Sequence, residues 1–187
     1  MGEARGWYSR GYVPHFDSPE RIQHVVFRTF DSLPEHVRPD RQADARQRAA
    51  AFDEALDAGH GARLLSAPAA AALVENALLH FDGERYRLLA WCVMPNHVHV
   101  VFDQIEEFPL PDVVRSWKAY SAAHINRATG RRGALWARDY FDRFMRDETH
   151  LARTIDYVEI NPVKAGLCRL PEDWRFSSAH RRLKMPA

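Results

Sequence analysis

Residues 86–103, YRLLAWCVMPNHVHVVFD, constrain the fold of this chain more than any other segment. Two apolar runs, at 86–93 and 97–102, flank Met94, Pro95 and Asn96. Three turn-like residues between two runs rich in β-branched and aromatic side chains predict an antiparallel hairpin. Because both runs are almost wholly apolar, we expect this hairpin at the centre of a sheet.

The rest of the chain supplies further strands and helices around that hairpin. Strands are predicted at 22–30 and 140–145, and helices at 40–58, at 66–81 with Ser66 as cap, at 112–128 and at 148–160 with Asp147 as cap. This order favours the α+β class, with an antiparallel sheet backed by helices in a ferredoxin-like plan. We expect a single domain over 1–187, with an irregular lead-in at 1–20 and a basic tail at 179–187.

Composition sets the class of protein. With 187 residues, 46% of them hydrophobic, the chain can bury a real core, roughly 70% of its unfolded surface. Two cysteines are too few for a disulfide framework and favour a reducing interior. The sequence lacks an apolar run of membrane-spanning length and a hydrophobic N-terminal signal, so we expect a soluble, cytoplasmic protein without a membrane partner.

The net charge of +1 conceals an uneven distribution. Residues 1–110 hold 11 Lys and Arg against 16 Asp and Glu, a balance of −5, whereas residues 111–187 hold 15 against 9, a balance of +6. A chain polarised in this way can present a cationic face to a polyanion although its sum is near neutral.

His97 and His99 are the sharpest candidates for chemistry. Residues i and i+2 of a strand point to the same face, so the two imidazoles project side by side while Val98 points into the core. Such a pair can provide adjacent ligands for a divalent cation. A bare His-x-His is more often an ordinary pair of sheet histidines, so this spacing alone is a weak signal.

Tyr157 and Asn161 form a second candidate pair, on the helix predicted at 148–160. Leu151, Ile155 and Val158 mark its core stripe, and Tyr157 and Asn161 share a different face about 100° away. A tyrosine can act as a covalent nucleophile and an amide oxygen can bind a metal. The alternatives are a boundary tyrosine and, for Asn161, a cap before a turn that starts at Pro162.

Five segments together resemble the REP-associated tyrosine transposases, a branch of the single-tyrosine HUH endonucleases of insertion sequences. They cover most of residues 22–178 and are HVVFRTFDSLP at 24–34, AWCVMPNHVHVVF at 90–102, SWKAYSAAHINR at 116–127, LWARDYFDRFMRDETHL at 135–151 and YVEINPVKAGL at 157–167. The family's histidine–hydrophobe–histidine motif falls on His97, Val98 and His99. Its catalytic tyrosine falls on Tyr157 and its third metal ligand on Asn161, where insertion-sequence members have Gln.

The resemblance implies an HUH endonuclease core that carries out metal-dependent strand transfer on single-stranded or hairpin DNA. The tyrosine would attack a backbone phosphate to give a 5′-phosphotyrosine and a free 3′-hydroxyl. By the same analogy the metal is Mg²⁺ or Mn²⁺, although imidazole ligands alone would equally suit Zn²⁺. The protein would act as a monomer or a homodimer.

Basic residues interleaved with Trp117 and Tyr120 suit a single strand, because bases stack on aromatic rings and phosphates bind cations. The candidates for DNA contact are Arg115, Lys118, Arg127, Arg131, Arg132 and Lys164. A solvated helix face explains each of the helix residues about as well. We nevertheless expect a cationic face around His97 and Tyr157.

Other interpretations compete with a transposase. A histidine-triad nucleotide hydrolase would need a third histidine where this chain has Val101. A structural metal site that adds Cys92 would need that side chain on the histidine face, and a domesticated transposase would bind hairpin DNA without cutting it. Tyr120 and Tyr140 are rival nucleophiles, but neither has Asn or Gln four residues on.

Overall fold

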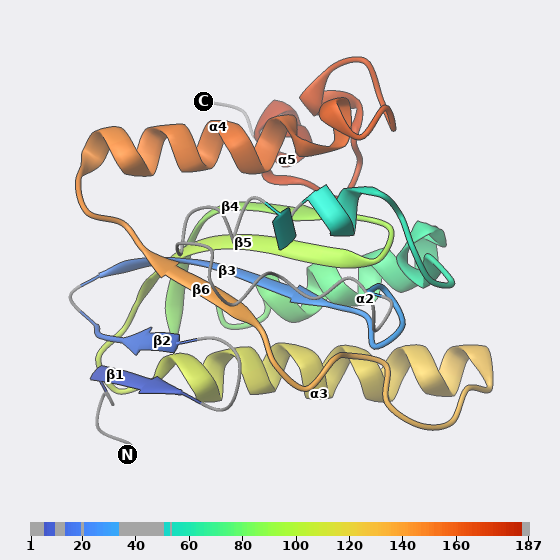
Figure 1. Cartoon of the computed structure of the whole chain (residues 1–187), viewed down its shortest axis with the longest axis horizontal. Coiled ribbons are helices and arrows are strands. Elements are labelled where there is room, and N and C mark those ends of the chain that lie inside the picture. Colours follow the sequence, from blue (N-terminus) through green and yellow to red (C-terminus); the bar gives the residue numbers. More distant parts are fainter. Residues whose placement is uncertain (1–5, 10–13, 20, 34–50, 53, 185–187) are drawn as a thin grey trace.

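The computed structural model describes residues 6–9, 14–19, 21–33, 51–52 and 54–184 (Figure 1). Its main sheet has four strands in the order β4-β5-β3-β6, and each neighbouring pair is antiparallel. The strands are β3 (Ile22–Arg28), β4 (Tyr86–Val93), β5 (His97–Gln104) and β6 (Phe141–Phe144). The α+β class and the ferredoxin-like plan are thereby confirmed.

The predicted hairpin forms the β4–β5 pair. The backbone N–H of Met94 donates to the carbonyl of His97 over 2.9 Å, which closes the turn at Pro95 and Asn96. Beyond the turn, Val93 lies opposite Val98 and Cys92 lies opposite His99. Since β3 pairs with the other edge of β5, the strand that carries the histidines is held on both sides.

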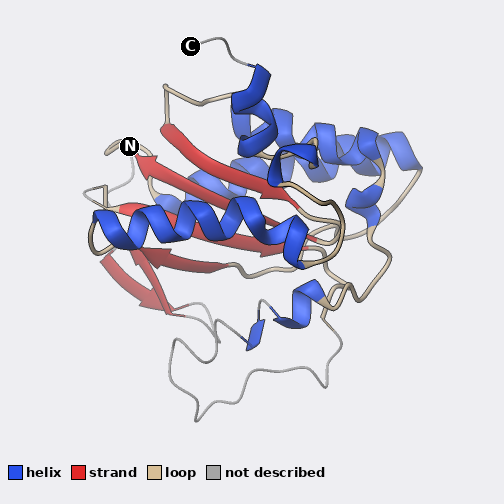
Figure 2. Ribbon diagram, turned by 90° about the horizontal axis from the view of Figure 1, so that it is seen from above, coloured by secondary structure: helices blue, strands red, loops and turns tan. Residues whose placement is uncertain are grey.

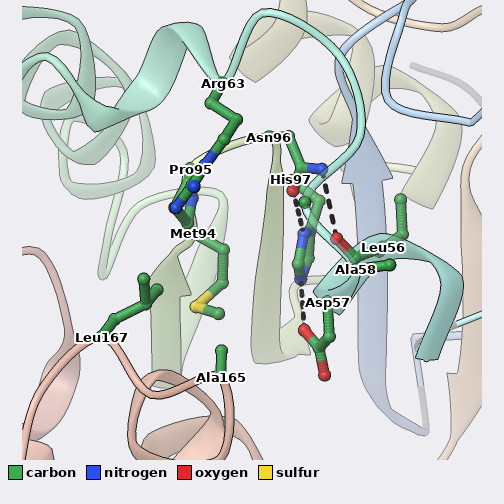
Figure 3. Close-up of a pocket in the computed structure, with 11 residues that line it drawn as sticks. Leu56, Asp57, Ala58, Arg63, Met94, Pro95, Asn96, His97, Ala165 and Leu167 are labelled. Carbon is green, nitrogen blue, oxygen red and sulfur yellow. Dashed lines mark hydrogen bonds and ion pairs between the residues drawn. The ribbon is translucent and has the colours of Figure 1, made fainter.

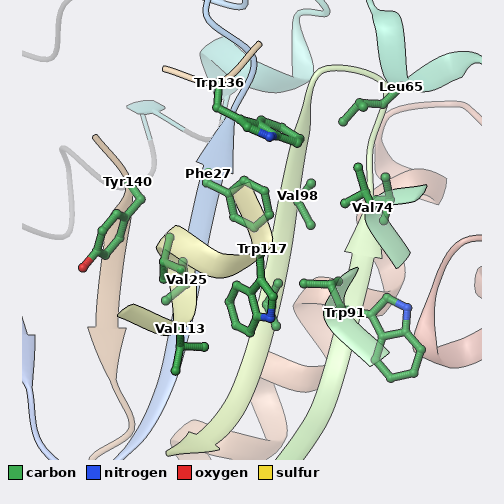
Figure 4. Packing of buried hydrophobic residues seen from close by; sticks show 14 of the residues in the cluster. Val25, Phe27, Leu65, Val74, Trp91, Val98, Val113, Trp117, Trp136 and Tyr140 are labelled. Carbon is green, nitrogen blue, oxygen red and sulfur yellow. The ribbon is translucent and has the colours of Figure 1, made fainter. Parts of the chain in front are cut away.

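One face of the sheet carries the larger core. Val98 and Phe102 of β5 point to this face, where they meet α2 (Pro68–Leu79) and α3 (Leu110–Thr129). Trp117 of α3 is 1% exposed and packs against Phe27 and Phe102 (Figure 4). Its indole N–H donates to the Tyr86 hydroxyl over 2.7 Å, so the polar atom of this large buried ring is satisfied.

The other face is covered by α4 (Glu148–Lys164), which lies across the sheet from α3 (Figures 1 and 2). The helix begins where predicted, because the Asp147 carboxylate accepts the backbone N–H of His150 over 2.7 Å. Val158 joins a smaller apolar cluster with Ala90 and Val101, and Leu151 and Ile155 pack against it. The histidine face of β5 therefore lies beneath α4.

Two of the helix boundaries that differ from the prediction have a clear physical reason. Ser66 caps no α-helix: it ends a 3-10 turn, η1 (Leu64–Ser66), and α2 begins at Pro68, whose fixed φ suits the first helical position. At the other end of the chain, α4 continues through Pro162 to Lys164 instead of ending at 160. The helix continues because the Ala165 N–H still donates to the Asn161 carbonyl, which makes Asn161 a helical residue and not a cap.

The two chain ends also differ from expectation. Within 1–20, β1 (Gly6–Ser9) pairs with β2 (Pro14–Asp17), so this segment is a small sheet and not an irregular lead-in. The predicted basic tail forms α5 (Ser178–Lys184), preceded by the 3-10 turn η2 (Pro171–Asp173). Ser178 fastens α5 to the sheet by donating to the Trp91 carbonyl over 3.3 Å and accepting the Trp91 N–H over 3.1 Å.

The helix predicted at 40–58 lies largely outside the described residues. In its described part, residues 51–52 and 54–57 are helical. Across the described residues, no helix combines the length and the apolar character needed to cross a membrane.

Candidate active site

His97 and His99 project together from β5 toward α4, as the strand period predicted. They are 1% and 0% exposed, and their Nε2 atoms are 3.0 Å apart. Two nitrogen ligands about 2.1 Å from one cation lie about 3.0 Å apart when they subtend a right angle. The pair therefore has the spacing of two adjacent metal ligands.

Asn96 fixes which nitrogen of His97 is available. Its amide Nδ2 donates to the carbonyls of Leu56 and His60, each over 3.1 Å, so its Oδ1 is the atom that faces His97 Nδ1 at 2.8 Å. An amide oxygen can only accept, so Nδ1 of His97 carries the proton. The neutral ring then directs the lone pair of Nε2 toward His99.

His24, a residue that the sequence analysis did not single out, supports His99 in a similar way. It lies on β3, is 5% exposed, and places its Nε2 3.2 Å from Nδ1 of His99. The two rings stack with centroids 5.4 Å apart. This contact depends on the pairing of β3 with β5, in which His24 lies opposite Val101 on the histidine face. Local sequence spacing contains no signal for it.

Helix α4 supplies the other half of the site. Asn161 is fully buried, and its Nδ2 is 3.3 Å from Nε2 of His99. The Tyr157 ring lies edge-on to His99, with centroids 5.8 Å apart, and to His24 at 6.4 Å. We expected Tyr157 and Asn161 on a face away from the core, and this was wrong: both turn toward the sheet together with Val158.

Burial keeps all three histidines neutral. It lowers the pKa of His97 and of His24 to about 3, and it holds the pKa of His99 well below the usual value, with the neighbouring histidines adding to the effect. Neutral imidazoles expose lone pairs at any pH near 7, as metal ligands must.

The arrangement fits a divalent cation. Two Nε2 atoms face one another, and the buried Oδ1 of Asn161 has no hydrogen-bond partner in the part of the chain that the structure describes. A half-turn of that amide would direct its oxygen to the histidines. Within the described residues, no three His, Cys, Asp or Glu side chains form a metal-binding group, so the amide oxygen is the natural third ligand.

A pocket of about 170 Å³ opens beside His97, between residues 56–63, the β4–β5 turn and the end of α4 (Figure 3). Leu56, Met94 and Leu167 form part of its apolar wall. Asp57 points toward His97, with Oδ1 3.8 Å from Nε2. Burial raises the pKa of Asp57 to about 6, against the opposing effect of Lys164. Because His97 is neutral, this contact is not an ion pair.

The predicted DNA-contact residues do not gather around this site. Arg115, Lys118 and Arg127 lie on α3, which packs on the opposite face of the sheet, so the expected cationic face around His97 and Tyr157 is wrong for them. Arg115 pairs with Asp112 over 2.9 Å, and Lys118 donates to the carbonyls of Ala137 and Arg138. The other two arginines of the prediction, Arg131 and Arg132, follow α3 and are exposed.

Different cations lie on the face that carries the site. The Lys164 ammonium is 4.8 Å from the centroid of the Tyr157 ring. Among the six predicted DNA-contact residues, Lys164 is the one that lies close to the site. Arg28 lies directly opposite His97 in the β3–β5 register, and Arg143 lies opposite His24 in the β3–β6 register. Since residues opposite one another share a face, both arginines project on the histidine side.

The structure also bears on the rival residues. Cys92 shares the histidine face, opposite His99, as a structural metal site would require. However, burial raises the pKa of its thiol, and its Sγ contacts Met94 Sδ, so it is a core residue. Tyr120 is exposed on α3 and Tyr140 packs against His15, both away from the histidine pair.

Comparisons with known proteins place this arrangement in a class. Residues 72–161 match the model of the family described as "Transposase IS200 like", a segment that contains His97, His99, Tyr157 and Asn161. Over this segment the chain is similar to the IS200-like transposases, which confirms the resemblance seen in its motifs.

Two similar proteins are described as REP-associated tyrosine transposases. The chain is 26% identical over 110 residues to the Escherichia coli protein of that name, covering 58% of this chain and 64% of the other. It is 29% identical over 115 residues to a Haemophilus influenzae protein assigned to the same group, covering 53% of this chain and 62% of the other. The chain thus spans somewhat less than two thirds of each of these relatives.

A solved structure confirms the fold. It is described as a REP-associated tyrosine transposase bound to a REP hairpin, and it superposes with a TM-score of 0.59 at 20% identity, over 98% of this chain and 86% of the other.

Proposed function

We propose that this protein is a metal-dependent endonuclease and strand transferase that cleaves single-stranded, hairpin-bearing DNA. The observation that carries the proposal is the meeting of four side chains from two elements. His97 and His99 on β5 present Nε2 atoms 3.0 Å apart, Asn161 contacts His99, and the Tyr157 ring lies edge-on to His99. The hairpin substrate is supported by the relative whose structure holds a REP hairpin.

In the proposed reaction the Tyr157 oxygen attacks a backbone phosphorus. The new O–P bond leaves the DNA 5′ end on the tyrosine, and the bond from phosphorus to the 3′ oxygen breaks. The phenol proton passes to solvent and the leaving 3′ oxygen takes up a proton. His97, His99 and Asn161 would hold Mg²⁺ or Mn²⁺, which would supply positive charge to neutralise the phosphate.

The remaining residues prepare the site for that step. Asn96 and His24 hold the two imidazoles in place, and α4 holds Tyr157 one turn from Asn161. Lys164, close to the Tyr157 ring, can meet a phosphate oxygen. Five basic residues on and after α3 are proposed to contact the DNA away from the cleavage point: Arg115, Lys118, Arg127, Arg131 and Arg132. The protein is proposed to act as a monomer or a homodimer.

The test mixes the protein with Mn²⁺ and an end-labelled hairpin oligonucleotide that carries a single-stranded extension, and resolves covalent adducts on a denaturing gel. We expect an adduct with the wild type and with Tyr120→Phe, and none with Tyr157→Phe, which keeps the ring contacts. His97→Ala should abolish cleavage and leave most DNA binding. An adduct that survives Tyr157→Phe would exclude this nucleophile, and tight binding without cleavage by the wild type would indicate a domesticated binder.

A further inference from the structure

Asp57 faces the histidine pair with an acceptor atom for which the described part of the chain supplies no donor. Among the described residues its buried Oδ1 has no hydrogen-bond partner, and it lies 3.8 Å from Nε2 of His97. A buried carboxylate oxygen without a partner is costly, so native proteins rarely keep one without a reason. The close-up in Figure 3 shows the carboxylate directed at the imidazole.

The atom that Asp57 faces is also an acceptor. Asn96 fixes the proton of His97 on Nδ1, so Nε2 presents a lone pair toward the Asp57 carboxylate. Two acceptors directed at one another gain nothing from the contact. Between such atoms, attraction requires a cation or a donor bound to one, such as the water of a hydrated metal ion.

The position of Asp57 is built into the fold. Asn96 donates to the carbonyls of Leu56 and His60, which lie on either side of Asp57 along the chain. The same asparagine orients His97. The carboxylate and the imidazole are therefore held by a single side chain of the β4–β5 turn, so their relative placement is fixed.

We propose that Asp57 supplies the negative charge of the cation site, accepting a hydrogen bond from water bound to the ion that His97, His99 and Asn161 hold. The inference rests on the proposed function. Those three ligands are neutral, so they bring no negative charge to the cation. Mg²⁺ and Mn²⁺ favour oxygen donors, and Mg²⁺ keeps several of its waters, so a carboxylate oxygen can contact the ion through water. Among the described residues, no three His, Cys, Asp or Glu side chains are close enough together to bind a metal directly. This agrees with Asp57 contacting the ion through water.

The test measures Mn²⁺ affinity in the Tyr157→Phe protein saturated with the hairpin oligonucleotide, using the electron paramagnetic resonance signal of free Mn²⁺. Asp57→Asn keeps the size and removes the charge, and we expect it to weaken Mn²⁺ binding about 10- to 100-fold, as lost outer partners of a metal site do. Glu54→Gln is the matched control: it removes one charge from an exposed position of the same helical segment. The Mn²⁺ affinity of the Glu54→Gln variant should stay within about twofold of that of the Tyr157→Phe protein.

Thermal unfolding without metal separates this role from a structural one. The amide that Asp57→Asn introduces can donate to His97 Nε2, so this variant should unfold at the same or a higher temperature while Mn²⁺ stabilises it less. The role of Asp57 would be overturned if Asp57→Asn left the Mn²⁺ affinity unchanged. It would also be overturned if this variant unfolded at a lower midpoint temperature than the parent in the absence of metal. If His97→Ala also leaves Mn²⁺ affinity unchanged, or the parent binds no Mn²⁺, the proposed metal site fails as well.

Discussion

At the scale of single residues, two asparagines of the site differ in how far their hydrogen bonds are satisfied. Asn96 uses both amide hydrogens and its oxygen within the protein, so it acts as a brace for His97 and the preceding segment. Asn161 is just as buried, but its Oδ1 has no hydrogen-bond partner among the described residues. The unsatisfied oxygen distinguishes the proposed ligand from the brace, although the two side chains are chemically identical.

His24 gives a prediction at this scale. A metal-binding His99 must carry its proton on Nδ1, and His24 Nε2 is placed to accept it at 3.2 Å. We expect His24→Leu to weaken Mn²⁺ binding about 10- to 100-fold. His24→Gln, whose amide oxygen can take the place of Nε2, should recover most of the loss. Calorimetric Mn²⁺ titration measures both, and equal affinities for the Leu and Gln variants would contradict a positioning role.

At the scale of secondary-structure elements, α4 couples the proposed nucleophile to the proposed third ligand. Tyr157 and Asn161 are one helical turn apart, so the helix itself fixes their spacing. The turn that holds them lies in the second half of α4, whereas the cap of the helix lies at Asp147. The start of α4 can therefore loosen without disturbing the site.

This separation predicts the effect of removing the cap. Asp147→Ala deletes the acceptor for the His150 N–H and should lower the free energy of unfolding by about 1 kcal/mol. Adduct formation at 25 °C should change less than about twofold, because Tyr157 lies more than two turns away. Urea unfolding and the gel assay check the two parts. A large loss of adduct in a folded variant would show that the whole helix positions the tyrosine.

The parts of the fold predicted from the sequence are those that local patterns determine. The alternation along β5 separates His97 and His99 from Val98, and Asp147 marks the start of α4. Long-range placement carries no such signal. The His24 contact depends on strand pairing, and the Asp57 contact depends on bonds from Asn96 to a distant segment. For the same reason, the charge pattern alone could not show on which face α3 would lie.

At the scale of the whole molecule, a buried charged cluster fastens the N-terminal hairpin to the main sheet. His15 of β2 contacts the carboxylates of Asp142, on β6, and Asp139, the latter at 3.0 Å. Burial alone would lower the pKa of His15, but the two carboxylates outweigh it and raise the pKa to about 9. Phe16 adds a ring contact with Phe144, with centroids 4.9 Å apart.

This cluster predicts a loss of stability in alkaline solution. The raised pKa means that the folded state holds the His15 proton more tightly than the unfolded state. Protonated His15 therefore contributes up to about 3 kcal/mol to the free energy of unfolding. This contribution is complete below pH 6.5 and is lost as the pH rises through about 9. His15→Gln should be less stable at pH 7, with a flatter profile from pH 7 to 9.5. Parallel profiles of the two proteins in urea unfolding would contradict the assignment.

The sheet divides the molecule into two faces that can change independently. On β5, Val98 and Phe102 meet α3, while His97 and His99 meet α4. In evolutionary terms, selection for stability would act on the core between the sheet and α3, and selection for the proposed chemistry would act on the site beneath α4. A lineage that lost the need to cut DNA would accumulate changes at Tyr157, Asn161 and the histidines while Trp117 and its neighbours stayed under selection. Under the proposed function, selection for cleavage would act on the α4 face, where this chain has all four proposed site residues.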